Sequence, residues 1–485
     1  MNQSGWRVFH LLAAPVLAVL VTFNLPLAGD GGIPQALALS AAGRWTVGCG
    51  IWMAWWWLTE PVPLPVTSLL PALLFPLLGV QSMVATLAPY ADPLLFLFLG
   101  GFVLAAAIEK WGLHRRFAFS LLALSGGQSH RLVLSIMAAT TFISFWLSNT
   151  ATAVLMFPVA LSLARQAEVE DNLRKCLVLG VAYSATIGGI GTLIGTPPNV
   201  FVSSFLHSQY HQTLDFWTWL GIGMPVVAVM MPATYWLMVR VIFPLGVQQV
   251  PLAFGERQES SWAWSRLDAS ARATLVIFAL AAFAWVTREL WVKLELGGIK
   301  PFAALTDAGI AMAAALALFV FPLSRARGPA LAWEDTLRLP WGTLLLFGGG
   351  LSLAAAIGAN HVDALLGQML AGMPAVPKPV AIAAIATTVI FVSEVASNIA
   401  TAAALTPLLA AAAPSLGLTP VEAAIITALG ASSAYMMPVG TAPNALAYGS
   451  GHISTREMAR TGLVLNLLSI ALITLLGCYA LPAHL

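Results

Sequence analysis

Apolar stretches follow one another along the whole chain, separated by short polar or charged segments. A helix of roughly 20 apolar residues is long enough to cross the hydrocarbon core of a membrane. Eleven stretches approach this length, and we expect each to be a membrane-spanning helix. They cover residues 8–28, 43–58, 64–80, 93–111, 176–195, 218–245, 271–292, 303–323, 343–358, 421–437 and 461–482.

Two further apolar stretches, residues 133–165 and 380–413, have polar residues at their centres. Ser148-Asn149 and Ser397-Asn398 divide these stretches into arms that are short for a membrane crossing. Irregular backbone is tolerated at membrane depth only inside protein or in a wet cavity. We therefore expect two re-entrant hairpins in an all-α polytopic membrane protein.

Composition supports a protein that lies entirely in the membrane. Of 485 residues, 59% are hydrophobic and 9% are charged, whereas about a quarter of the residues of a soluble domain are charged. The N-terminal apolar stretch lacks a small-residue cleavage site at the right distance, so we interpret it as a spanning helix rather than a signal peptide. Because no cluster of Lys and Arg is present, we expect no nucleic-acid partner.

The two halves of the sequence resemble each other in three segments that occur in the same order. The offsets are nearly constant, at 248, 249 and 245 residues, and the matched segments are 98–108 with 346–356, 142–153 with 391–402, and 195–199 with 440–444. Gene duplication is the simple explanation. The interpretation divides the chain into a first helix (1–42), a first repeat (43–246), a linker (247–270) and a second repeat (271–485).

Each repeat contains five expected spans and one hairpin, so the chain crosses the membrane an odd number of times per repeat. The two repeats are therefore expected to have inverted topology. With the N-terminus inside, 17 basic residues lie on the cytoplasmic side and 5 lie outside. This bias agrees with the rule that cytoplasmic loops are rich in Lys and Arg. We expect a protein of the cell (inner) membrane with a cytoplasmic N-terminus, a cytoplasmic linker and an external C-terminus.

The matched segments carry the polar chemistry. Residues 195–199 (Gly-Thr-Pro-Pro-Asn) and 440–444 (Gly-Thr-Ala-Pro-Asn) should interrupt helices, because Pro lacks a backbone donor. Freed carbonyls with Ser, Thr and Asn oxygens suit a small cation, and a helix N-terminus suits an anion. No Lys, Arg or His occurs in 139–160, 387–410 or 434–448. Bound cations would therefore supply much of the charge that a multiply charged anion requires.

These motifs resemble the divalent anion:sodium symporter family over nearly the whole chain. The resemblance includes residues 51–61 (Ile-Trp-Met-Ala-Trp-Trp-Trp-Leu-Thr-Glu-Pro), 67–71, both Ser-Asn pairs and 435–444. It implies a homodimeric, elevator-type transporter that carries a C4 dicarboxylate, such as succinate, malate or fumarate, together with sodium ions.

The resemblance also implies which residues form the sites. One sodium site would use Ser144, Ser148, Asn149 and Gly195, and the other would use Ser393, Ala396, Asn398 and Gly440. The substrate carboxylates would meet Asn149, Thr150, Thr196, Asn398 and Thr441. Ile399 and Ala442 depart from the common bacterial pattern of Thr and Pro at these positions, which leaves citrate, tartrate, 2-oxoglutarate or sulfate open.

Several alternatives stay open at the level of sequence. An anion exchanger without sodium coupling would share the same fold, a passive channel would not saturate, and an intramembrane enzyme would need a base that the Ser-Asn pairs lack. Glu394 lies in the second hairpin at the position of Phe145 in the first. An acidic group at membrane depth either binds a cation or proton or holds the hairpin through hydrogen bonds.

Overall fold

The computed structural model describes residues 3–25, 39–165, 169–246, 249–250, 267–296, 298–322, 328–370 and 376–481. Within these ranges the chain is helical and contains no β-strand, which confirms the expected all-α class. Most of the expected linker lies outside the described residues.

Eight described helical segments are long and apolar enough to cross a membrane. They are Gly5–Asn24, Met83–Lys110, Asp171–Ile190, Phe216–Ile242, Ala269–Lys293, Trp341–Ala359, Asn398–Leu416 and Thr455–Tyr479. The expected spans at 64–80, 303–323 and 421–437 correspond to shorter apolar helices, and 43–58 corresponds to helix α2 (Ala41–Thr59). The total of eleven spans therefore stays a prediction.

Each expected hairpin is a pair of helices joined by four residues. The first is α8 (Ser129–Ser144) and α9 (Asn149–Ala164), and the second is α17 (Lys378–Ser393) and α18 (Asn398–Ala412). In each pair the two helices pack against each other. Asn398–Leu416 alone is long enough to span a membrane, so the re-entrant character of the pairs stays a prediction.

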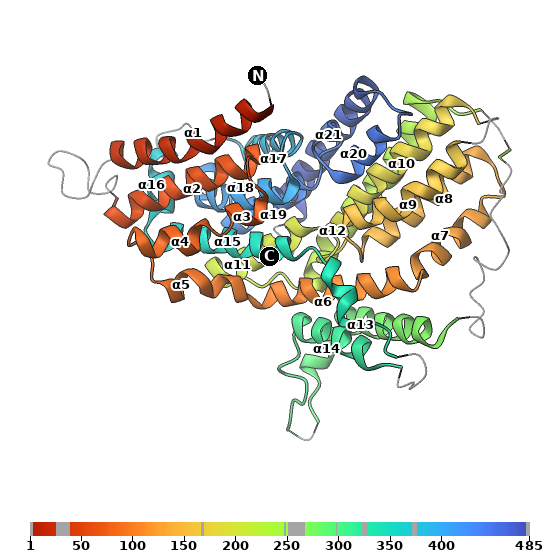
Figure 1. Cartoon of the computed structure of the whole chain (residues 1–485), viewed down its shortest axis with the longest axis horizontal. Coiled ribbons are helices and arrows are strands. Elements are labelled where there is room, and N and C mark those ends of the chain that lie inside the picture. Colours follow the sequence, from red (N-terminus) through yellow and green to blue (C-terminus); the bar gives the residue numbers. More distant parts are fainter. Residues whose placement is uncertain are drawn as a thin grey trace.

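A helix interrupted at its middle follows each hairpin. After the first hairpin, α10 (Asp171–Ile190) gives way to α11 (Pro197–Tyr210), and after the second, α19 (Pro420–Ala431) gives way to α20 (Ala442–Gly449). The distal parts cross between the halves, since α11 packs on α18 and α19 while α20 packs on α9 and α10. This exchange holds both hairpins and both interrupted helices together (Figure 1).

A second group of helices lies beside these elements. It contains α2, α3 (Leu64–Thr67), α4 (Leu70–Leu77), α6 (Pro93–Lys110), α14 (Asp307–Val320) and α15 (Trp341–Ala359). Helix α15 packs on α2, α3 and α4, and α14 packs along α6. In Figure 1, α13 (Ala269–Lys293) and α14 form the lower part of the view.

The chain contains several further described elements. They are α1 (Gln3–Asn24), α5 (Met83–Leu87), η2 (Ala88–Ala91), α7 (Leu113–Leu124), α12 (Phe216–Trp236), the π-helical turn η3 (Leu237–Ile242), η5 (Trp333–Arg338), α16 (Val362–Leu370), η6 (Ala413–Leu416) and α21 (Thr455–Tyr479).

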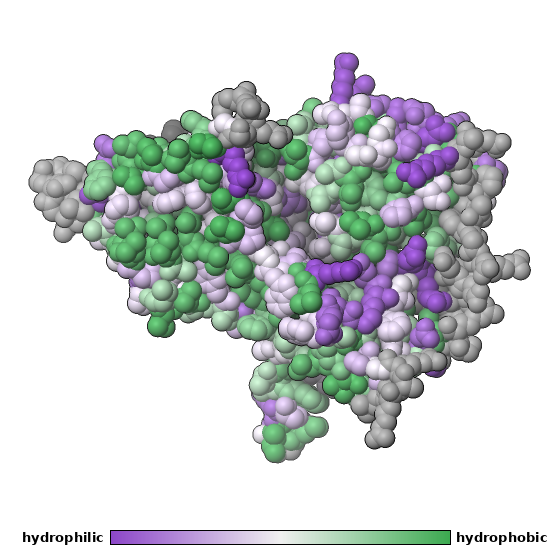
Figure 2. Space-filling model, in the orientation of Figure 1, coloured by the Kyte–Doolittle hydropathy of each residue, from purple (hydrophilic) through white to green (hydrophobic). Residues whose placement is uncertain are grey.

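The outer surface is apolar where a soluble protein would be polar. Helix α1 exposes a continuous series of large apolar side chains, namely Trp6, Val8, Phe9, Leu12, Val16, Val19, Leu20 and Phe23. Apolar side chains also cover much of the face over α1, α2 and α4 in Figure 2. Extended apolar surface of this kind marks contact with lipid or another protein.

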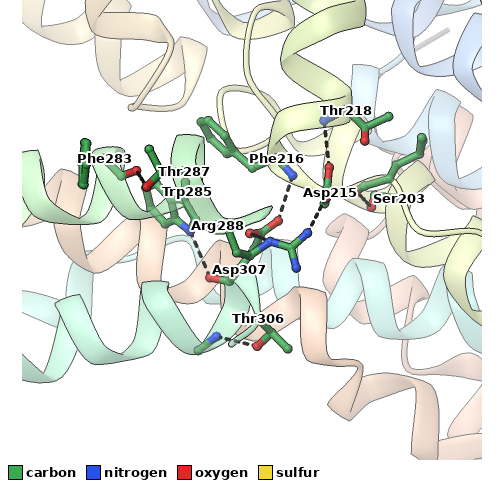
Figure 3. A network of polar contacts seen from close by, with 12 residues as sticks. Ser203, Asp215, Phe216, Thr218, Phe283, Trp285, Thr287, Arg288, Thr306 and Asp307 are labelled. Carbon is green, nitrogen blue, oxygen red and sulfur yellow. Dashed lines mark hydrogen bonds and ion pairs between the residues drawn. The ribbon is translucent and has the colours of Figure 1, made fainter. Parts of the chain in front are cut away.

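An ion-pair network joins α12, α13 and α14 (Figure 3). The Arg288 guanidinium pairs with the carboxylates of Asp215 and Asp307, with Nε 2.9 Å from Asp307 Oδ1. Asp307 Oδ2 also accepts a hydrogen bond of 2.8 Å from the Phe216 amide, and the backbone carbonyl of Asp307 accepts one of 3.1 Å from Trp285 Nε1. The network fixes the start of α12 to the α13–α14 pair.

Candidate functional site

Four helix N-termini meet at one cavity. They belong to α9, α11, α18 and α20, and their N-cap residues are Ser148, Thr196, Ser397 and Thr441. Each half of the chain contributes one hairpin helix and one distal half of an interrupted helix. Because Ser and Thr cap helices well and Pro fits the first turn, these sequences start helices at the expected breaks.

The cavity has a volume of about 620 Å³. All five residues expected to meet substrate line it, as do Ser148 and Gly440 of the expected sodium sets. Ile399 and Ala442, the two departures from the common pattern, line it as well. The residues predicted from the sequence therefore line one cavity, although they lie up to almost 300 positions apart in the chain.

The opposite wall of the cavity comes from the second group of helices. It is formed by Glu60, Leu64, Phe102, Pro340 and Thr343. Among the described residues that line the cavity, none is basic and Glu60 is the one ionisable side chain. A bound anion therefore meets helix N-termini, hydroxyls and amides rather than Lys or Arg.

Behind the cavity, each hairpin carries a cluster of buried oxygen atoms. The Ser144 hydroxyl lies 3.2 Å from Asn149 Oδ1 and 2.6 Å from the carbonyl oxygen of Ala185. A hydroxyl has one proton to donate, so it cannot satisfy both acceptors fully. The result is a small oxygen-rich centre beneath the tip of the hairpin.

The second half repeats this centre. The Ser393 hydroxyl lies 2.9 Å from Asn398 Oδ1 and 2.8 Å from the carbonyl oxygen of Ala431. Ser144 and Ser393 are both fully buried and do not line the cavity. Ala396 is buried in the connection between α17 and α18, also away from the cavity lining.

Glycines allow the interrupted helices to approach these centres. A Cβ atom on Gly195 would lie 2.9 Å from the carbonyl oxygen of Ser144, and one on Gly440 would lie 3.1 Å from that of Ser393. A Cβ atom on Gly189 would lie 2.1 Å from Asn149 Oδ1. Larger residues at these three positions would push the carbonyl and amide oxygens apart.

Comparison with known proteins agrees with this geometry. The family described as "Citrate transporter" matches residues 54–430. The chain belongs to this family of transporters. The resemblance to divalent anion:sodium symporters is thereby confirmed.

Two relatives of the family are similar over nearly their whole length. A protein of Staphylococcus saprophyticus named "Sodium-dependent dicarboxylate transporter SdcS" is 35% identical over 457 residues, which cover 92% of this chain and 87% of the relative. A protein of Staphylococcus aureus with the same name is 35% identical over 492 residues, covering 99% of this chain and 92% of the relative.

Two solved structures share the fold. The YdaH transporter of Alcanivorax borkumensis superposes with a TM-score of 0.61 at 16% identity and covers 99% of both chains. MtrF of Neisseria gonorrhoeae gives a TM-score of 0.60 at 12% identity and covers 98% of this chain and 94% of its own. At these identities the likeness concerns the fold alone.

Two asparagines of the family motif have a role that sequence analysis did not assign. Asn199 Nδ2 donates to the carbonyl oxygens of Gly189 and Thr192, at 3.1 and 2.9 Å. Asn444 Nδ2 donates to those of Ala434 and Met437, at 3.5 and 3.2 Å. Both amides bind the carbonyls freed where the helix is interrupted. Their position at the end of each matched motif was the available signal.

Proposed function

We propose that this protein is a secondary active symporter that carries a C4 dicarboxylate, such as succinate, malate or fumarate, together with sodium ions. The observation that carries the proposal is the meeting of four helix N-termini, two from each half, at a cavity with no basic residue among the described residues that line it.

The helix N-termini at this cavity favour an anion. Each carries a partial positive charge whose effect is screened and falls off within the first turn, so the four together supply only part of the counter-charge that a dianion requires. Two carboxylates can each face a pair of N-termini and accept hydrogen bonds from backbone amides. Asn149, Thr150, Thr196, Asn398 and Thr441 are the proposed substrate residues because they surround this space.

Bound sodium ions would supply the rest of the positive charge that the dianion requires. The centre at Ser144, Ser148, Asn149 and Gly195 and its counterpart at Ser393, Ala396, Asn398 and Gly440 are the proposed sodium sites. Hydroxyl, amide and carbonyl oxygens are suitable ligands for a hard cation, and a break in a membrane helix exposes such carbonyls. The names of the two staphylococcal relatives, which state sodium dependence and dicarboxylate transport, support this assignment.

Equivalent contacts in the two halves support a duplicated origin, and the odd number of expected membrane crossings in each repeat supports inverted topology. The hydrogen bonds of Ser144 and Ser393 pair equivalent atoms in the two halves, as do those of Asn199 and Asn444. We assign the repeats to residues 43–246 and 271–485, after a first helix at 1–42, with a linker at 247–270 on the cytoplasmic side.

Transport would require the cavity to change sides. Its lining divides between the hairpins with their interrupted helices and the group that includes α3, α6 and α15. We propose that the first group moves past the second by an elevator mechanism within a homodimer. The excess of basic residues on one side favours insertion in the inner membrane with the N-terminus in the cytoplasm and the C-terminus outside.

Among the alternatives, an anion exchanger without sodium coupling is the nearest, because it would share this fold. The two oxygen centres argue against it, because an exchanger would have no use for them. An intramembrane enzyme would need an activated nucleophile or a metal-bound water at the cavity. A channel would conduct at rates that do not saturate with substrate.

Uptake into proteoliposomes tests the proposal. Labelled succinate should accumulate under an inward sodium gradient but not under an equal potassium gradient, and uptake should saturate. Citrate, tartrate, 2-oxoglutarate and sulfate serve as competitors, because Ile399 lies at the cavity where the common pattern has a hydroxyl. Uptake that requires anion preloaded inside, whichever cation is present, would instead establish an exchanger.

A further inference from the structure

The two halves fasten the interrupted helix to the hairpin tip by different chemistry. In the first half, the Thr192 hydroxyl donates a hydrogen bond of 2.5 Å to the carbonyl oxygen of Phe145. The equivalent of Thr192 is Met437, whose side chain has no hydroxyl, and the equivalent of Phe145 is Glu394. The second half therefore cannot form this hydrogen bond.

In the second half, the carboxylate of Glu394 connects the hairpin tip to the interrupted helix. Its oxygens accept hydrogen bonds of 2.7–3.0 Å from the backbone amides of Tyr435, Met436 and Met437. Asn466 Nδ2, from α21, donates a further one of 2.7 Å. Three successive amides that converge on one anion form a nest of the kind that holds phosphate or carboxylate groups. Two roles were considered for Glu394, namely binding a cation or proton and holding the hairpin through hydrogen bonds. These contacts support the second role directly.

These contacts also define the charge of the group. All five are made by N–H donors, which suit an ionised carboxylate, whereas the O–H of a protonated carboxyl would require an acceptor that these five contacts do not provide. Glu394 is 3% exposed, and no Lys, Arg or His in the described part of the chain forms an ion pair with it. A negative charge is thus buried without a cationic partner.

The residue that carries this charge adjoins the proposed second sodium site. The backbone carbonyl of Glu394 faces Gly440, where a Cβ atom would lie 3.0 Å from it. The preceding residue, Ser393, holds Asn398 Oδ1 at 2.9 Å. The first site has the apolar Phe145 at the equivalent place. The two oxygen centres therefore share a Ser, an Asn and a Gly among their proposed ligands but differ in the charge beside them.

We infer that Glu394 makes the second sodium site stronger than the first, so that the second site fills before the first. The inference rests on the proposed function and adds an order of binding to it. Glu394 acts as a positioning residue, because its carboxylate orders residues 435–437 and its charge attracts the cation without being counted among the ligands. Buried charges interact over several ångströms at the low effective dielectric constant of a protein.

Glu394→Gln tests this inference, because it keeps the shape of the side chain and removes the charge. Thermal stability of the purified protein would be measured against sodium at constant ionic strength with potassium, without anion, since a ligand that binds the native state stabilises it. Sodium dependence of succinate uptake would be measured in parallel. We expect the half-saturating sodium concentration to rise about tenfold in both, as for loss of one nearby charge interaction.

Glu422→Gln is the matched control. Glu422 is also a buried acidic residue of the second half, but it binds Lys378 and caps the start of α19, at the opposite end of that helix from Ala431. The half-saturating sodium concentration of Glu422→Gln should equal that of the wild type. A fall in maximal uptake by Glu394→Gln with unchanged half-saturation would overturn the inference and leave Glu394 a purely structural role.

Two further outcomes are separable. If Glu394→Gln does not accumulate, Glu394→Asp withdraws the charge by one methylene, and its half-saturating sodium concentration should still rise; no change would contradict the inference. If the wild-type protein itself shows no response to sodium, the proposed symport fails before the order of binding can be asked.

Discussion

Ser144 and Ser393 are the residues that best separate cation binding from anion binding. Each lies behind the cavity rather than in its lining, and each hydroxyl contacts an Asn side-chain oxygen and a backbone carbonyl. A change at either residue therefore affects the oxygen centre while leaving the cavity wall in place.

We predict that Ser144→Ala and Ser393→Ala each raise the half-saturating sodium concentration of uptake about fivefold, because the loss of one buried polar contact costs about 1 kcal/mol. The apparent affinity for succinate at saturating sodium should change much less. Thr274→Val is the matched control, since Thr274 is a buried hydroxyl on α13 that bonds the Ser270 carbonyl. Equal sodium dependence in all three variants would remove Ser144 and Ser393 from the proposed sites.

At this scale, repetition made much of the cavity predictable. The Ser-Asn pairs and the Gly-Thr motifs occur twice at a nearly constant offset, and recurrence at equivalent positions argues against chance packing of Ala-rich helices. The nest of backbone amides that binds the Glu394 carboxylate could not be predicted, because these donors lie 41–43 residues away in the sequence. Which amides are left free depends on where the helix is interrupted in three dimensions.

Among the elements, α12 depends on α13 and α14 for its position. Arg288 of α13 balances two carboxylates, those of Asp215 just before α12 and Asp307 at the start of α14. Asp307 is nearly buried, with its side chain 6% exposed, whereas Arg288 is 20% exposed. Removal of the arginine would leave two like charges close together and poorly solvated.

We predict that Arg288→Gln lowers the free energy of unfolding by about 2 kcal/mol, less than for a fully buried pair because solvent reaches the guanidinium. Thermal unfolding in detergent would measure the effect. Lys293→Gln breaks an exposed pair with Glu289 on the same helix, and it should change stability by no more than about 0.5 kcal/mol. Similar losses in the two variants would show that the network does not anchor α12.

Sequence patterns located the long helices better than the short ones. Apolar length identified segments such as 271–292 and 461–482, which correspond to α13 and α21. The short helices α5, α7 and α16 were missed, because they are not apolar enough over a sufficient length. The Arg288 network was missed for another reason: its partners lie 73 and 19 positions from Arg288, and only the packing of three helices brings them together.

For the whole molecule, two structural features act together. Four helix N-termini and several hydroxyls face a cavity that contains no lining basic side chain among the described residues. Two oxygen-rich centres lie directly behind it, one in each half. Because the anion depends on cations for part of its counter-charge, empty and half-filled states should be poor at binding it. Coupling between sodium and anion would follow from this dependence without a separate gating element.

The proposed inverted repeat would allow one molecule to offer the same site to both sides of a membrane. Each half supplies a hairpin, an interrupted helix and an oxygen centre, and the distal helix of each half packs against the hairpin of the other. The sequence could predict the duplication, but the exchange of α11 and α20 between the halves required the folded structure. Through that exchange, both centres lie in one packed group of helices.

Binding of succinate to the purified protein tests the central claim most directly. Isothermal titration would be carried out in sodium and in potassium at equal ionic strength. The account predicts saturable binding in sodium and at least about tenfold weaker binding in potassium, since a charge interaction of several kcal/mol is lost. Equal affinity for succinate in the two salts would contradict it, because the cavity would then bind the dianion without help from cations.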